Sequence, residues 1–74
     1  MNWKRVTHAM LETDDRVFQI SRAPPIRGQV TYRAWRRATN DVLLAMTVDD
    51  TPEDRARAVE RCKEVCEAAW MPPV

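Results

Sequence analysis

Glycine occurs once in these 74 residues, histidine once and serine once, so several kinds of active site are excluded at the outset. With Gly28 as its single glycine, the chain cannot form a glycine-rich phosphate-binding loop. Ser21 lacks the flanking glycines of a nucleophile elbow. A catalytic pocket needs a nucleophile, a base and an orienting group together. We therefore expect no enzymatic activity and no cofactor.

Long apolar runs are also missing. No segment approaches the ~20 consecutive apolar residues that a membrane-spanning helix needs. A secretory signal has an apolar stretch after its first charged residues, and residues 1–5 are not followed by one. We expect a cytoplasmic protein with no membrane partner. The 45% hydrophobic and 31% charged content is typical of a globular chain, and 74 residues suffice for one small domain over 1–74.

Only two cysteines are present, Cys62 and Cys66, four residues apart in a helical pattern. On a helix they share one face, with side-chain directions that do not favour a disulfide. A metal or redox pair with His8 as a third ligand is one interpretation. Burial as small apolar side chains is the interpretation we prefer, because free cysteine is among the most buried residue types. We therefore expect no metal site.

Charge is present in abundance and is divided along the chain. Residues 1–37 carry most of the basic side chains, and residues 38–74 carry most of the acidic ones. The formal net charge of +1 conceals this asymmetry. A folded chain of this kind would present cationic and anionic surfaces to different partners.

A helix is predicted after Thr51. Thr51 is suited to the N-cap, Pro52 to the first helical position, and Glu53 and Asp54 to the positive end of the helix dipole. Apolar residues then recur at three- and four-residue spacing, and Pro72-Pro73 ends the pattern near Trp70. The apolar stripe contains Val59, Cys62, Cys66 and Ala69.

Three extended segments precede this helix, at residues 17–22, 30–37 and 42–48. A further strand near residues 3–7 is an alternative. Short connections favour an antiparallel meander. We predict an α+β domain in which a three-stranded sheet, or a four-stranded one, is covered on one face by the C-terminal amphipathic helix. The expected core is Phe18, Ile20, Val30, Tyr32, Leu44, Met46, Val59, Cys62 and Cys66.

A longer pattern carries a resemblance. It runs Arg16-Val17, Ile20-Ser21-Arg22-Ala23, Gly28 and Tyr32-Arg33-Ala34-Trp35, followed by Leu43-Leu44-Ala45 and a helix with Glu-Arg-Cys and Cys-Glu. This pattern resembles small uncharacterised proteins encoded by phages and prophages. The layout is also similar to a double-stranded-RNA-binding domain without its first helix, although the helix here opens on acidic residues. The resemblance implies action in a bacterial host cytoplasm.

Arg33, Trp35 and Arg37 form the leading candidate binding site. Alternation along a strand places all three on one sheet face, which we expect to lie away from the helix. Two guanidiniums beside an indole suit base stacking with phosphate contact, or a protein hot spot. The plainer interpretation is that Trp35 and the arginine stems only cover the sheet. Two further arginines, Arg22 and Arg27, complete the predicted partner-binding set.

An acidic surface is the alternative site. It would imitate nucleic-acid phosphates, although dipole compensation and a solvated helix face explain such charges equally well. Its members are Asp49, Asp50, Glu53, Asp54, Glu60 and Glu64.

Three functions are consistent with these features. The first is a non-enzymatic interaction protein that binds a host protein or nucleoprotein complex, in the manner of an anti-CRISPR inhibitor of a nucleic-acid-handling complex. The second is direct nucleic-acid binding through Arg33, Trp35 and Arg37. The third is a self-associating structural or assembly factor, for which a homodimer is the simplest form.

Overall fold

The computed structural model describes residues 1–70. Its elements, in chain order, are β1 (Trp3–Thr7), β2 (Met10–Thr13), β3 (Phe18–Arg22), β4 (Gln29–Arg36), β5 (Asp41–Asp49) and α1 (Pro52–Ala69). The fold is α+β, as the sequence predicts, but the sheet has five antiparallel strands rather than three or four.

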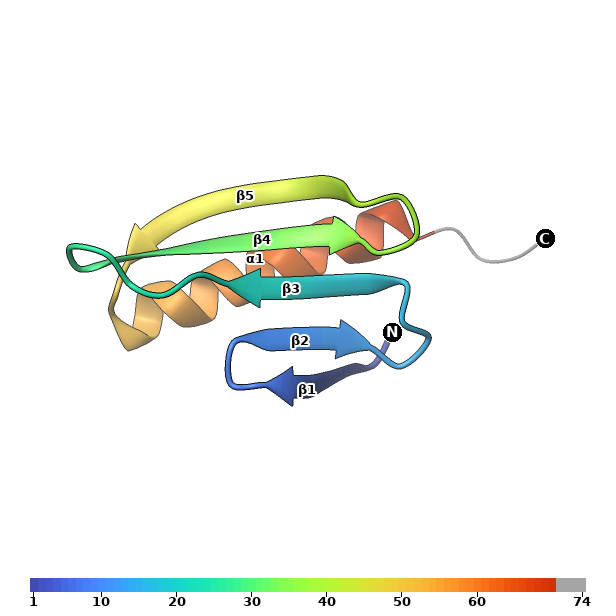
Figure 1. The fold of residues 1–74 in the computed structure, drawn as a ribbon, viewed down its shortest axis with the longest axis horizontal. Coiled ribbons are helices and arrows are strands. Elements are labelled where there is room, and N and C mark those ends of the chain that lie inside the picture. The colour runs from blue at the N-terminus through green and yellow to red at the C-terminus, as the bar shows by residue number, and fades with distance from the viewer. Residues whose placement is uncertain (71–74) are drawn as a thin grey trace.

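The strands form a meander in which each one pairs with its neighbour in the chain, from β1 at one edge to β5 at the other. Helix α1 lies against one face of the sheet, where it contacts β3, β4 and β5 (Figure 1). Among the described elements it makes no comparable contact with β1 or β2, so this hairpin extends the sheet beyond the helix. The other face of the sheet carries no second layer (Figure 1).

The N-terminal hairpin accounts for the difference in strand number. The strand near residues 3–7 is confirmed as β1, whereas β2 was not predicted. Apolar alternation does not reveal β2, because two of its four residues, Glu12 and Thr13, are polar and yet buried. Their burial depends on residues from other parts of the fold, so the local pattern of apolar residues does not predict it.

The turn between β2 and β3 is fixed by the Thr13 hydroxyl. This hydroxyl accepts the backbone N–H of Phe18 at 3.1 Å and donates to the Asp15 carboxylate at 2.6 Å. The Asp15 carboxylate also accepts the N–H of Val17 at 3.1 Å. These hydrogen bonds, that from Thr13 foremost, hold the pKa of Asp15 below its usual value. The turn at Asp14-Asp15 is thus held by side chains as well as by the backbone.

Helix α1 begins and ends where the sequence predicts. The Thr51 hydroxyl accepts the N–H of Asp54 at 3.2 Å, Pro52 is the first helical residue, and Trp70 is the C-cap. Pro72 and Pro73 lie outside the described residues. No helix within residues 1–70 is long and apolar enough to cross a membrane.

The core lies between α1 and the inner face of β3–β5. Of the nine predicted members, six are buried; Leu44, Met46 and Val59 are only partly buried and pack at its margin. Two fully buried alanines, Ala34 of β4 and Ala58 of α1, were not predicted. Small side chains at these positions allow the helix to approach the sheet closely. The buried apolar core consists of Phe18, Ile20, Val30, Tyr32, Ala34, Ala58, Cys62 and Cys66.

Candidate interaction surface

The sheet face that α1 leaves uncovered carries the side chains that strand alternation placed there. Trp35 of β4 pairs with Gln19 of β3, and Arg33 pairs with Ser21. Because Ile20, between Gln19 and Ser21, is in the core, its two neighbours point to the opposite face. We call this surface the outer sheet face. By register its members are Lys4, Met10, Glu12, Gln19, Ser21, Thr31, Arg33, Trp35, Val42, Ala45 and Thr47.

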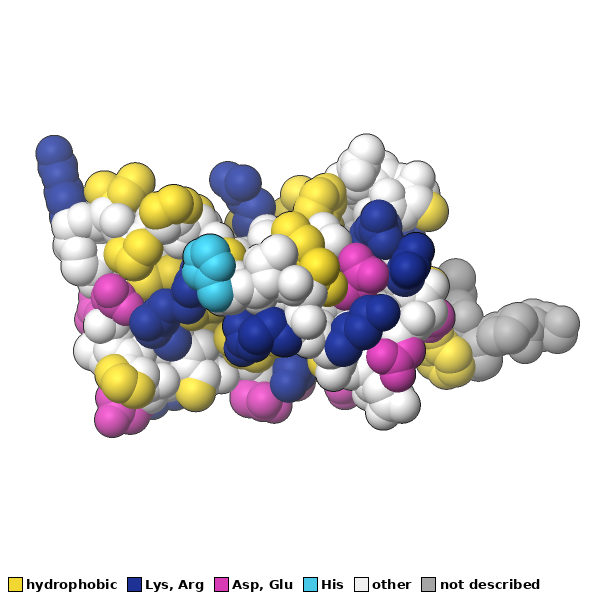
Figure 2. Space-filling model, turned by 60° about the horizontal axis from the view of Figure 1, so that its bottom comes forward, with side chains coloured by type: hydrophobic (Ala, Val, Ile, Leu, Met, Phe, Trp, Pro, Cys, Tyr) yellow, Lys and Arg dark blue, Asp and Glu magenta, His cyan; other side chains and the backbone are white. Residues whose placement is uncertain are grey.

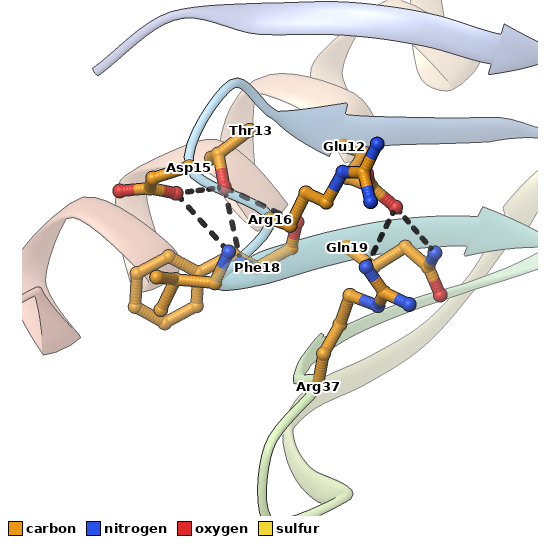
Figure 3. Close-up of polar contacts among 8 residues, drawn as sticks. Glu12, Thr13, Asp15, Arg16, Phe18, Gln19 and Arg37 are labelled. Atoms are coloured by element: carbon orange, nitrogen blue, oxygen red, sulfur yellow. Dashed lines mark hydrogen bonds and ion pairs between the residues drawn. The ribbon is translucent and has the colours of Figure 1, made fainter.

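A buried carboxylate lies in the middle of this face. Glu12 is only 7% exposed although no helix covers it. Its Oε2 accepts a hydrogen bond from Gln19 Nε2 at 3.1 Å and lies 3.3 Å from Arg37 Nη1 (Figure 3). Arg16 Nε lies 3.8 Å from Glu12 Oε1. A buried charge needs such partners, so Arg37 has a structural role that its sequence position did not indicate.

Trp35 lies beside this cluster, across from Gln19. Its side chain is partly buried, and its indole N–H is covered without an acceptor among residues 1–70. The solvent-accessible part of the indole is therefore ring carbon, since its one polar atom is hidden. This ring can make apolar or stacking contacts but cannot offer a hydrogen bond without moving.

Lys4 and Arg33 complete the charge on the outer sheet face. Lys4 pairs with Glu12 in the β1–β2 register, but its ammonium makes no ion pair within the described part of the chain. Arg33 is exposed and has no carboxylate within 4.0 Å among residues 1–70. The outer sheet face thus combines a partly exposed indole with two cations that have no acidic partner among residues 1–70, while Arg16 and Arg37 beside it pair with Glu12.

Arg22 and Arg27 do not join this group. Arg22 pairs with Tyr32 on the inner, helix-side parity, and its Nη2 donates to the carbonyl oxygen of His8 at 3.2 Å. Arg27 lies at the tip of the β3–β4 connection with φ of 53°, beside Gly28 with φ of 75°. That tip is at the opposite end of β4 from Arg37 (Figure 1). Of the five predicted positions, Arg33, Trp35 and Arg37 therefore lie on or beside the outer sheet face. Arg22 and Arg27 lie elsewhere.

Basic side chains are also prominent beside the N-terminal hairpin. Figure 2 turns the β1–β2 side toward the viewer and shows Lys and Arg side chains in a broken row, with apolar side chains between them. The single histidine, His8, lies within this view and is exposed in the β1–β2 turn.

The alternative acidic surface is largely neutralised by its own neighbours. Asp54 lies 3.2 Å from Arg57, Glu64 lies 3.2 Å from Arg61, and Glu60 lies 3.7 Å from Lys63. Asp50 pairs with Arg55 at 3.3 Å. Within residues 1–70, Asp49 and Glu53 make no such ion pair. The exposed face of α1 is therefore a mixed-charge surface, which fits a phosphate-binding groove poorly.

The two thiols lie in the core and face the sheet. Cys62 and Cys66 are fully buried and unbonded to each other, and burial raises the pKa of each thiol to about 11. His8, the third ligand of the metal alternative, is exposed in the β1–β2 turn, whereas both thiols are buried. In the described residues, no three His, Cys, Asp or Glu side chains are grouped to hold a metal ion.

Comparisons with known proteins add no family to this description. The chain matches no protein-family model, and comparisons with curated proteins and with solved structures found no match.

Proposed function

We propose that this chain is a phage-encoded, non-enzymatic interaction protein that binds a host protein through its outer sheet face, in the manner of an anti-CRISPR inhibitor of a nucleic-acid-handling complex. The phage context comes from the sequence resemblance. One structural observation carries the choice of surface. In the five-stranded sheet α1 covers β3–β5 on one face and leaves the other face open, and the open face carries a partly exposed Trp35 and an Arg33 that has no acidic partner among residues 1–70.

Residue type supports a protein partner. Tryptophan and arginine are the side chains most enriched among binding hot spots, where a few residues supply most of the affinity. The covered N–H of Trp35 leaves an apolar ring for contact, and apolar burial drives most protein association. Val42, in the same cross-strand row as Trp35, is 56% exposed and extends the apolar area.

Direct nucleic-acid binding is less well supported by the charges. Arg16 and Arg37 each pair with Glu12 but keep further N–H donors, so within the described chain this face and its margin offer at most four cations to phosphate: Lys4, Arg16, Arg33 and Arg37. Four phosphate contacts give a log–log salt slope of about −4 on duplex DNA, against six to ten contacts for tight binders.

Self-association is the second candidate, and the β5 edge of the sheet favours it. Within residues 1–70, strand β5 (Asp41–Asp49) has no strand partner on its outer side, and between its two terminal aspartates it contains no charged residue and no Pro. Charged side chains and Pro usually protect an edge against pairing with another chain. Light scattering over a hundredfold range of concentration tests this function. A monomer at every concentration would remove it.

Capture of a partner tests the proposed function. Tagged protein is used to recover partners from bacterial lysate, with and without nuclease, and the affinity of the purified partner is then measured. Replacing Arg33 and Trp35 with alanine should weaken binding about 30-fold or more, as expected from loss of a hot spot worth at least about 2 kcal/mol.

The matched control is the double variant Arg57→Ala with Arg61→Ala. Both arginines are exposed on the helix, and their surface ion pairs contribute little to stability. This variant should bind the partner as the unmodified chain does. Unchanged affinity after loss of Arg33 and Trp35 would contradict the proposal, and capture that nuclease abolishes would favour nucleic-acid binding instead.

A further inference from the structure

Two guanidiniums converge on a single neutral oxygen at the end of the N-terminal hairpin. Arg5 Nη1 donates to the carbonyl oxygen of His8 at 3.1 Å, and Arg22 Nη2 donates to the same oxygen at 3.2 Å. The two side chains come from different strands, β1 and β3, on either side of β2. The β1–β2 turn therefore brings together two like charges that are far apart in the sequence.

Neither cation has an acidic partner. Among residues 1–70, no carboxylate oxygen lies within 4.0 Å of the guanidinium nitrogens of Arg5 or Arg22. Each guanidinium carries five N–H donors, whereas one carbonyl oxygen offers two lone pairs. Most of the donors are therefore available to another acceptor. An anion placed between the two side chains would satisfy them and remove the repulsion between like charges.

The same two arginines stand at the rim of a hollow with an apolar floor. The hollow has a volume of about 60 Å³, and it lies on the helix side of the sheet, where β1 and β2 extend beyond α1. By their burial we assign Arg5, His8 and Arg22 to its rim and Leu11, Ile20, Tyr32 and Val59 to its floor. Ala9, Met10 and Ser21 complete the lining.

Size and lining together restrict the ligand. A hollow of about 60 Å³ has room for a small charged group with a short stem. The apolar floor favours an aliphatic stem, which a nucleic-acid phosphate lacks. Guanidinium forks match the two oxygens of a carboxylate in bidentate geometry.

We propose that this hollow is a carboxylate-binding site that receives an acidic side chain of a partner protein. The carboxylate lies between Arg5 and Arg22, and its aliphatic stem rests on Leu11 and Ile20. This inference deepens the proposed function, on which its biological role rests, because it specifies the chemistry of one contact with the partner. Arg5 and Arg22 are not members of the outer sheet face, although Met10 and Ser21 belong to that face and also line the hollow.

A titration of the full chain with small probes tests the site without the partner. Butyrate carries a carboxylate on a three-carbon stem, butyramide is its neutral counterpart, and inorganic phosphate represents the alternative anion. Each is followed by NMR through the Nε–H signals of Arg5 and Arg22 and the methyl signals of Leu11 and Ile20. We expect saturable shifts of both sets with butyrate and none with butyramide.

Variants assign the binding to the two arginines. Arg5→Gln with Arg22→Gln should weaken butyrate binding at least tenfold, while Arg5→Lys with Arg22→Lys should retain part of it, since charge remains but the fork geometry is lost. Arg27→Gln should leave it unchanged, because Arg27 is an exposed arginine at the tip of the β3–β4 connection and does not line the hollow. If the double glutamine variant does not fold, the double lysine variant still tests whether butyrate binding depends on the two arginines.

Several results would overturn the site: no saturable shift with butyrate, equal shifts with butyramide, or unchanged binding in both double variants. Tighter binding of phosphate than of butyrate would overturn its assignment to carboxylates. The outcome is independent of the outer sheet face. Loss of Arg33 and Trp35 should not change butyrate binding, and failure of partner capture would not alter the titration.

Discussion

Replacing Phe18 with alanine is expected to lower the free energy of unfolding by about 3–5 kcal/mol. Phe18 is 1% exposed, and its ring is covered by the guanidinium of Arg36, 5.8 Å from the ring centroid. Arg36 also donates to the carbonyl oxygen of Ala69 at 3.3 Å, so it joins the end of β4 to the end of α1 over this ring. Loss of the ring would leave a cavity and remove the support of Arg36.

Because the domain is small, this loss is a large fraction of its total free energy of unfolding. At roughly 0.05–0.15 kcal/mol per residue, a domain of 74 residues is stable by about 4–11 kcal/mol in total. Urea denaturation followed by circular dichroism measures the change. Val42→Ala is the matched control, since Val42 is 56% exposed and its truncation should cost less than about 0.5 kcal/mol. A loss below about 1 kcal/mol for Phe18→Ala would contradict the described core.

The buried thiols are expected to react at least about 100-fold more slowly in the folded protein than in the unfolded chain. Burial raises the pKa of Cys62 and of Cys66 from 9.0 to about 11, so the reactive thiolate is about 100-fold scarcer near pH 8. Their complete burial also keeps reagents out. Alkylation by iodoacetamide, with and without urea, measures the ratio. Comparable rates would indicate exposed thiols and would restore the redox interpretation of this pair.

The same shift makes stability dependent on alkaline pH. The unfolded chain loses its thiol protons near pH 9, while the folded protein retains them until about pH 11. Stability is therefore complete below pH 9 and declines between pH 9 and 11, by up to about 1.4 kcal/mol per pH unit for each thiol. In Cys62→Ala with Cys66→Ala, stability should decline less steeply over this range. Equal slopes in the two proteins would contradict the assignment.

The helix was the most predictable element. Its boundaries depend on local signals, namely Thr51, Pro52 and the three- and four-residue spacing of Cys62 and Cys66, and the structure confirms each of them. Strand alternation likewise predicted the side of the sheet on which Arg33 and Trp35 lie, because side-chain direction in a strand follows a period of two. The use of these residues as a binding surface stays a prediction.

What could not be predicted depends on contacts between distant segments. Glu12 resembles an ordinary surface residue in the sequence, and its burial requires Gln19 from the next strand and Arg37 from beyond β4. Arg5 and Arg22 are brought together only by the β1–β2 turn. No periodicity, cap or motif in the sequence records either arrangement.

Selective labelling of alanine methyl groups tests the central claim most directly. Ala45 is exposed on the outer sheet face, whereas Ala56 and Ala68 are exposed on α1. NMR spectra of the ¹³C-methyl-alanine-labelled protein are compared before and after addition of the captured, purified partner. If the uncovered face of the sheet is the contact surface, the Ala45 methyl signal shifts or broadens while those of Ala56 and Ala68 do not. Perturbation of the two helix methyls with an unchanged Ala45 signal would contradict it.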